Sequence, residues 1–150
     1  MSVESDVAIR PLRASDRAAW ETLFRAYINF YEAKVPDDVI ELTWKRLVGE
    51  EDGFWGIVAV DGGDRPIGIA HVLFHPSTWS PTSYAYLEDL YVDRAARRHG
   101  VGRALIKAVY EEADRRGATR TYWATKQDNT HARRVYDRVG VLTPFVQYRR

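Results

Sequence analysis

The chain has 150 residues, of which 45% are hydrophobic and 13% aromatic, so we expect one globular domain, residues 1–150, with a substantial core. The 22 lysines and arginines nearly balance the 21 acids, and this net charge of +1 argues against a nucleic-acid partner held by bulk charge. Cysteine is absent, which excludes disulfides, a cysteine nucleophile and thiolate-ligated metal. No stretch approaches the roughly 20 apolar residues of a membrane span, so we expect a cytoplasmic protein with no membrane partner.

The first third of the sequence predicts a short strand and two helices. Val7 to Leu12 has the composition of a strand, and Ser15 can cap the helix that follows. A second helix is expected from near Pro36, where proline suits a first turn, to about Gly49. The apolar stripe of the first helix is unusually aromatic and consists of Trp20, Leu23, Phe24, Tyr27 and Tyr31.

The middle of the sequence predicts strands. Phe54 to Val60 and Ile67 to Phe74 are rich in β-formers and are separated by the turn-forming segment DGGDRP, which favours an antiparallel hairpin. A looser segment, PSTWSPTS, precedes a further strand from Tyr84 to Val92. A strand-rich region between helical regions is typical of a mixed α/β fold.

The last third of the sequence alternates helices and strands. A helix that ends at Gly117 carries Ile106, Val109, Tyr110 and Ala113 on one face. Thr121 to Thr125 predicts a strand, and Asn129 can cap a helix that Gly140 stops. Phe145 to Tyr148 predicts a final strand.

Residues 97 to 105, RRHGVGRAL, place three basic residues before a Gly-x-Gly pair at the expected start of a helix. A helix N-terminus presents free N–H groups and partial positive charge, and glycine lets an anion approach the backbone, so the segment predicts a phosphate site. A P-loop is excluded because Arg103-Ala104 stands where Lys-Ser/Thr is needed. A dinucleotide fingerprint is excluded because Leu105 replaces its third glycine and the next strand ends without an acid.

Three segments together resemble the GCN5-related N-acetyltransferase (GNAT) superfamily. Arg97, Gly100 and Gly102 match its Arg/Gln-x-x-Gly-x-Gly/Ala pyrophosphate loop. YLEDLYV, from residue 86 to 92, resembles its fourth strand, and NTHARRVYDRVG, from residue 129 to 140, resembles its Asn-x-x-Ala…Tyr…Gly segment. The sequence is most similar to the small polyamine and histone-type acetyltransferases. It departs at Val141, where the family often has an aromatic residue.

The resemblance implies the GNAT fold, in which helices flank a mixed, mostly antiparallel sheet whose fourth and fifth strands splay apart. That gap leaves backbone free to pair with the pantetheine arm of acetyl-CoA, the implied cofactor. Other interpretations remain open. Leu90 to Val92 can be core residues of the strand, the arginines of residues 97–103 can simply be exposed to solvent, and Asn129 can serve only as a helix cap. The implied cofactor-binding residues are Leu90, Tyr91, Val92, Arg97, Arg98, His99, Gly100, Val101, Gly102, Arg103, Asn129 and Tyr136.

Acetyl transfer from a thioester to an amine needs a base for the ammonium and a proton for the leaving thiolate. Tyr136 stands at the family's general-acid position, and the polyamine enzymes use an acid at the position of Glu88. Adjacent strand residues point to opposite faces, so only one of Glu88 and Asp89 should face the cleft unless a bulge intervenes. Tyr136 can instead pack in the core, and both acids can lie at an edge. His71, His75 and His131 are further candidates for the general base, although a lone histidine more often has a structural role.

The acceptor site is expected on the first helices, with Trp79 as a further candidate. The implied acceptor-binding residues are Tyr27, Tyr31, Glu32 and Glu88, of which the tyrosines can equally continue the core stripe. The resemblance implies an acetyl-CoA-dependent N-acetyltransferase acting on a small amine, such as a polyamine or an amino acid, without a metal. The alternatives are a protein-lysine acetyltransferase and a non-catalytic acyl-CoA-binding domain. A homodimer is implied, with Phe145 and Tyr148 of the final strand at the interface.

Overall fold

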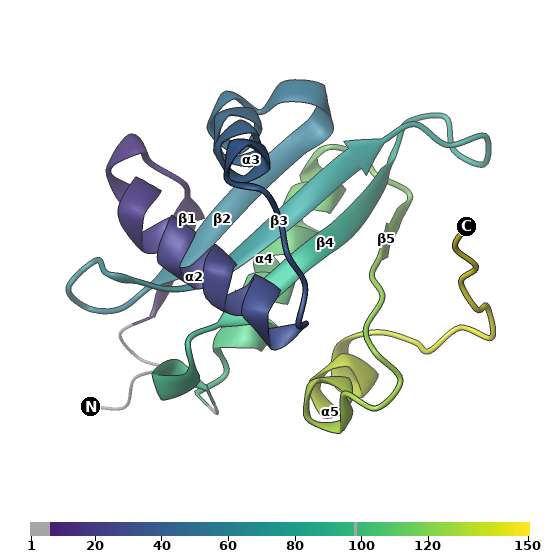
Figure 1. Ribbon diagram of the computed structural model, residues 1–150. Helices are drawn as coiled ribbons and strands as arrows, with labels where there is room; N and C mark the ends of the chain where they lie inside the picture. Colours follow the sequence, from purple (N-terminus) through teal and green to yellow (C-terminus); the bar gives the residue numbers. More distant parts are fainter. Residues whose placement is uncertain (1–6, 98) are drawn as a thin grey trace.

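The structure is a computed structural model that describes residues 7–97 and 99–150 and contains a twisted sheet with helices on both faces (Figure 1). Its strands are β1 (Ala8–Pro11), β2 (Phe54–Val60), β3 (Pro66–His75), β4 (Tyr84–Val92) and β5 (Arg120–Tyr122). Its α-helices are α2 (Arg17–Phe30), α3 (Asp37–Gly49), α4 (Val101–Arg115) and α5 (Thr130–Val139), and short 3₁₀ turns cover Ala14–Asp16, Glu51–Gly53 and Arg94–Ala96.

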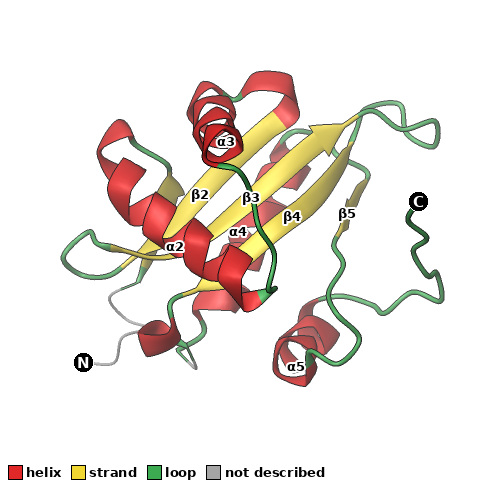
Figure 2. Ribbon diagram, in the orientation of Figure 1, coloured by secondary structure: helices red, strands yellow, loops and turns green. Residues whose placement is uncertain are grey.

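The strands lie in sequence order, β1-β2-β3-β4-β5. The first four pair antiparallel, and β5 pairs parallel to β4. The predicted hairpin of β2 and β3 and the mixed, mostly antiparallel sheet are therefore confirmed. Helices α2 and α3 cover one face, and α4 covers the other (Figure 2).

The strands alternate between two apolar clusters because successive side chains point to opposite faces. In β3, Ile69 packs with Trp20 and Ile40 beneath α2 and α3, whereas its neighbour Ala70 packs with Leu105 beneath α4. The aromatic stripe of α2 is thus core at Trp20 and becomes half-buried further along the helix. The same helix therefore supplies both the core and the surface beside the end of β4.

The fourth and fifth strands separate, as the resemblance implies. Only Tyr84 to Tyr86 pair with β5, at Arg120 to Tyr122. Among the described strands nothing pairs with the other edge of β4 from Leu87 to Val92. Beyond the gap lies α5, which carries no fully buried residue and contacts the rest through Trp123 and Tyr110.

Three local predictions are wrong. Ser15 does not cap α2, because it lies in a 3₁₀ turn in which Asp16 accepts the Arg13 N–H at 2.7 Å instead. The strand predicted over 121–125 begins one residue earlier and stops at Tyr122, where β4 has diverged and no partner remains. Residues 145–148 form no strand, because no described strand lies beside them to share hydrogen bonds (Figure 2).

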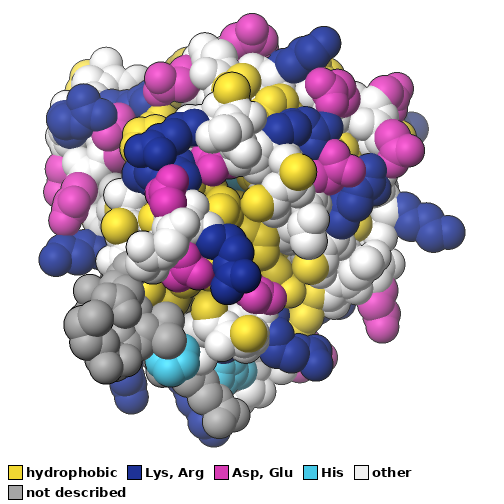
Figure 3. All heavy atoms as spheres, turned by 90° about the vertical axis from the view of Figure 1, so that its left-hand side faces the viewer, with side chains coloured by type: hydrophobic (Ala, Val, Ile, Leu, Met, Phe, Trp, Pro, Cys, Tyr) yellow, Lys and Arg dark blue, Asp and Glu magenta, His cyan; other side chains and the backbone are white. Residues whose placement is uncertain are grey.

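The charged residues are mixed over the face that Figure 3 shows, where basic and acidic side chains alternate without a large field of one sign. This arrangement agrees with the net charge of +1. No helix within residues 7–97 and 99–150 is long and apolar enough to cross a membrane.

Candidate active site

A cleft of about 790 Å³ lies where β4, α4, α5 and the end of α2 meet. It contains most of the residues that the resemblance assigns to acetyl-CoA and two of those assigned to the acceptor. They are Tyr27, Tyr31, Leu90, Tyr91, Val92, Arg97, Gly100, Val101, Gly102, Arg103, Asn129 and Tyr136. Segments separated by about a hundred residues of sequence therefore share one concave surface.

The N-terminus of α4 opens into this cleft without a side-chain cap and without an acid in its first turn. Gly100 precedes the helix with a φ of +75°, a conformation that favours glycine. At Gly102 a Cβ atom would find Val92 Cγ2 at 3.9 Å as its only near neighbour. Packing among the described residues therefore does not require a glycine at 102, and the open space beside it would let a phosphate approach the N–H groups of the helix.

Arginines surround this helix end. Arg97 donates from Nε to the carbonyl of Val92 at 3.0 Å, and its guanidinium lies 5.4 Å from the centre of the Tyr91 ring. Both contacts hold the side chain against the cleft wall. Arg94, Arg103 and Arg138 also line the cleft, so four basic side chains from three segments can neutralise phosphate charge.

The open edge of β4 forms the floor of the cleft. Leu90, Tyr91 and Val92 line it, and because backbone groups alternate along a strand, those of Leu90 and Val92 face the gap that β5 leaves, whereas those of Tyr91 face β3. A ligand amide can pair with such an edge as an additional strand would. The open edge and the uncapped helix together fit the amide-bearing arm and the pyrophosphate of acetyl-CoA.

Tyr136 extends from α5 into the cleft beside Ala132 and Val135. Its ring packs edge-on against Trp123 with centroids 5.6 Å apart, and its hydroxyl has no hydrogen-bond partner among the described residues. Burial, with a smaller contribution from Tyr31, raises the pKa of Tyr136 to about 12. The hydroxyl is therefore protonated at neutral pH and available to donate.

A β-bulge in β4 places Glu88 and Asp89 in an unusual relation. His71 is paired with Asp89, and the next residue of β3, Val72, is paired with Leu87, so Glu88 is the extra residue. Leu87 and Leu90 both pack on the α4 side, while Asp89 bonds His71 on the α2 side. The bulge thus gives the strand two consecutive acids away from the α4 face, the exception that the sequence left open.

The two acids differ in setting. Although much of Glu88 reaches solvent, the protein around its carboxyl and then the charge of Asp89 raise its pKa. Asp89 is 16% exposed and accepts a hydrogen bond from His71 at 2.9 Å. Neither acid lines the cleft itself, but the hydroxyl of the cleft residue Tyr27 donates to the backbone carbonyl of Glu88 at 3.4 Å.

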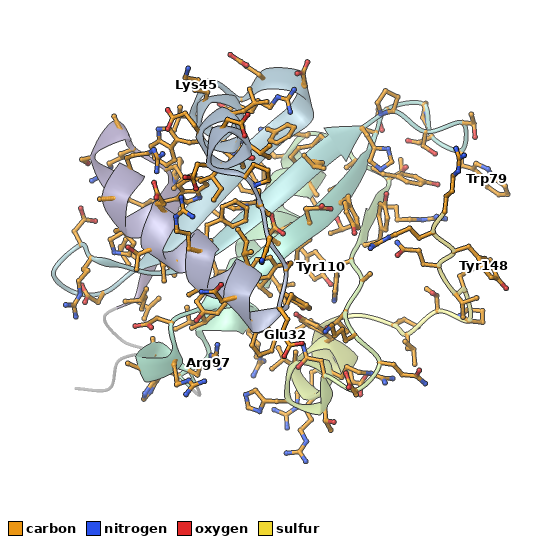
Figure 4. All side chains as sticks on the ribbon, viewed as in Figure 1. Glu32, Lys45, Trp79, Arg97, Tyr110 and Tyr148 are labelled. Atoms are coloured by element: carbon orange, nitrogen blue, oxygen red, sulfur yellow. The ribbon has the colours of Figure 1, made fainter. Side chains whose placement is uncertain are left out.

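Several predicted residues lie elsewhere. His99 and Glu32 do not line the cleft, and Trp79 is 84% exposed on the β3–β4 loop, far from α5 (Figure 4). Arg98 lies outside the described residues. Asn129 lines the cleft but makes no capping bond, because its amide donates to Thr125 instead.

Six cleft residues were not anticipated as cofactor or acceptor ligands. They are Phe30, Arg94, His131, Ala132, Val135 and Arg138. The helical spacing of positions 131, 135 and 138 around Tyr136 is a signal that could have identified the α5 members. Of the other candidate bases, His75 bonds Tyr122 and a backbone carbonyl, and His71 is buried.

An open strand edge that leads to an uncapped, arginine-lined helix end defines a protein that binds an extended, phosphate-bearing ligand. The Acetyltransferase (GNAT) family matches residues 18–141. A D-amino-acid N-acetyltransferase of Saccharomyces cerevisiae is 35% identical over 150 residues, covering 99% of this chain and 92% of that protein. A thialysine N-epsilon-acetyltransferase of Caenorhabditis elegans is 36% identical over 80 residues, 53% of this chain and 49% of that one.

Solved structures share the fold. An aminoglycoside N-acetyltransferase in complex with CoA superimposes with a TM-score of 0.83 at 22% identity, over 96% of this chain and 93% of that one. The chain belongs to the GNAT acetyltransferase family and is an acetyl-CoA-dependent N-acetyltransferase.

Proposed function

We propose that the protein transfers the acetyl group of acetyl-CoA directly to a primary amine of a small molecule, such as a polyamine or an amino acid. The observation that carries this proposal is the bulge in β4, which supplies two acidic residues beside Tyr27, a residue that lines the same cleft as Tyr136. An ammonium group is attracted to carboxylates and to aromatic faces, and both are present there.

The relatives support a small acceptor. One is named for D-amino acids and another for thialysine, and both of these substrates carry an amine. The aromatic surface of Tyr27 and Tyr31, whose ring centroids are 5.1 Å apart, offers a binding face for such a cation.

Acetyl-CoA supplies the reactive thioester. Leu90, Tyr91 and Val92 would hold its amide-bearing arm, and the N–H groups of Val101, Gly102 and Arg103 would hold its pyrophosphate together with Arg97. Glu88, whose pKa is raised, accepts the proton of the acceptor ammonium, directly or through water. The Tyr136 hydroxyl donates to the sulfur as negative charge develops on it.

The deciding experiment measures thiol release from acetyl-CoA against polyamines, D- and L-amino acids, aminoglycosides and a histone-tail peptide. Because the chain contains no cysteine, every thiol that a thiol reagent detects comes from CoA. We expect turnover with at least one small amine and far less with the peptide. Turnover restricted to the peptide would identify a protein-lysine acetyltransferase, and binding of acetyl-CoA without any turnover would contradict the proposal.

We also propose that the protein is a homodimer. Five large apolar residues of the segment after α5 are between 72% and 92% exposed, and the described part of the chain supplies no cover for them. A second copy can cover such a segment through a twofold contact. The apolar residues are Val141, Leu142, Phe145, Val146 and Tyr148.

A further inference from the structure

Two hydrogen bonds link the core to the acid pair on β4. The indole Nε1–H of Trp20 donates to Nε2 of His71 at 2.9 Å, and Nδ1 of His71 lies 2.9 Å from Oδ2 of Asp89. Trp20 is 0% exposed and His71 is 3% exposed. A buried polar chain of this kind costs free energy unless each group is satisfied, and here each is.

Trp20 determines which nitrogen of His71 carries the proton. An indole N–H can only donate, so Nε2 must be an acceptor without a hydrogen. The proton is therefore on Nδ1, which donates to Asp89.

The result is a carboxylate held in one orientation at the border of the cleft. Asp89 is followed by the cleft residue Leu90 and lies close enough to Tyr27 that, after burial, its charge is the largest cause of the raised pKa of that tyrosine. Phe24 packs edge-on against His71 at 5.0 Å, which blocks reorientation of the imidazole. The core of α2 thus determines where the negative charge lies.

We infer that His71 is a positioning residue for acetyl transfer, which holds the side chain of Asp89 in one orientation so that this carboxylate binds the acceptor ammonium beside Glu88. The inference rests on the proposed function, and it assigns different roles to Asp89 and Glu88. Asp89 binds and orients the cation, whereas Glu88, the exposed residue of the bulge, is free to accept its proton.

The fixed charge also acts on Glu88, because Asp89 contributes to the raised pKa of the Glu88 carboxyl. If the carboxylate of Asp89 turns away from Glu88, its contribution to the raised pKa of Glu88 becomes smaller, and the acid limb of the pH–rate profile moves to lower pH. The titratable groups that act on Glu88 or feel its charge are Asp89, His71, Tyr86, Tyr27 and Tyr122.

Two substitutions of His71 separate positioning from packing. The amide nitrogen of His71→Asn can replace Nδ1 and keep the bond to Asp89, while the bond to Trp20 is lost. The longer amide of His71→Gln reaches the position of Nε2, so it keeps the bond to Trp20 and loses the bond to Asp89. Each variant leaves one buried polar group unpaired, so their stabilities should fall similarly.

We expect kcat/KM for the amine to be about 10-fold or more lower in His71→Gln than in His71→Asn, the effect of losing a hydrogen bond to a charged group. KM for acetyl-CoA should be the same in both, and the acid limb should shift to lower pH only in His71→Gln. Glu112→Gln is the control, because it removes a buried carboxylate paired with Arg115 and Arg116 at the opposite end of α4. It should lower the melting temperature and leave turnover unchanged.

A smaller gap between the two His71 variants, in an active enzyme, overturns the inference and leaves the proposed function intact. A wild type that binds acetyl-CoA but acetylates no amine overturns both. Imidazole ¹⁵N chemical shifts of the wild type test the tautomer whether or not the variants fold. We expect the tautomer whose hydrogen is on Nδ1, and a ring whose hydrogen is on Nε2 overturns the inference.

Discussion

The roles proposed for Tyr136 as the acid and Glu88 as the base both involve a raised pKa. Burial keeps the Tyr136 hydroxyl protonated at every pH at which the enzyme would work. A raised pKa makes Glu88 a stronger base than an ordinary glutamate. Burial is the largest cause of both shifts, although the two residues lie on different elements, β4 and α5.

Replacing Tyr136 by Phe removes one hydroxyl and retains the ring against Trp123. If the hydroxyl donates to the departing thiolate, turnover at saturating substrates should fall by about 10²- to 10⁴-fold, while acetyl-CoA affinity and melting temperature change little. Steady-state kinetics, cofactor titration and thermal melts on the same samples measure the three quantities. A variant that retains more than about half the wild-type rate would sink the role of general acid.

Replacing Glu88 by Gln preserves the shape of the side chain and removes the base. The rate should fall most at low pH, because a protonated amine then has no acceptor for its proton, and should partly recover at high pH as free amine becomes abundant. The measurement is the pH–rate profile from about pH 6 to about pH 10, and the upper limit is close to the ordinary pKa of an amine. A uniform loss at every pH, with raised KM for the amine, would assign Glu88 to binding instead.

At the scale of elements, the proposed pyrophosphate site at the N-terminus of α4 can be tested by substituting Gly102. Gly102→Glu should abolish the rise in melting temperature that acetyl-CoA gives the wild type, because the carboxylate occupies the space at the N-terminus of α4 and repels phosphate. The unliganded variant should melt at or above the wild-type temperature, since an acid in the first turn contributes about 0.3–1 kcal/mol. Thermal melts with and without acetyl-CoA measure both effects.

Gly102→Ala is the matched control, because it adds only a Cβ atom in the open space beside Val92. It should weaken the shift without abolishing it. The same change at Gly100 is less informative, because its φ of +75° strains any other residue and lowers stability by itself. A full thermal shift in Gly102→Glu would show that the pyrophosphate binds elsewhere.

The long elements could be predicted because their patterns are strong, as with β2, whose bounds agree with the prediction, and β4, from Tyr84 to Val92. Arg97, Gly100 and Gly102, whose spacing predicts a pyrophosphate site, all line the cleft, and their binding of phosphate stays a prediction. The bulge at Glu88 could not be predicted, because register is a property of the pair of strands and not of β4 alone. Glu32 was expected in the acceptor site, but it lies in a turn after α2 with a φ of +53° and does not line the cleft, and the sequence pattern of α2 gives no sign of that turn geometry.

At the scale of the whole molecule, the segment after α5 determines the expected assembly. Light scattering at micromolar concentration should give about twice the 17.3 kDa of one chain. Truncation after Gly140 removes all five exposed apolar residues of the segment and should give a monomer. A wild type that already scatters as a monomer would contradict the dimer.

The weak attachment of α5 has a consequence for how the enzyme responds to its cofactor. One wall of the cleft, which includes Tyr136, is formed by α5, a helix without a fully buried residue. This helix packs against Trp123, whose ring lies so close to Gly140 that a Cβ atom there would clash. Such an element opens locally at a lower free energy than the sheet, and a ligand that bridges it to α4 closes that opening by mass action. Amide hydrogen exchange in α5 should therefore slow more on acetyl-CoA binding than exchange in β2 or β3, because the bound donor would hold the helix that carries Tyr136 against α4.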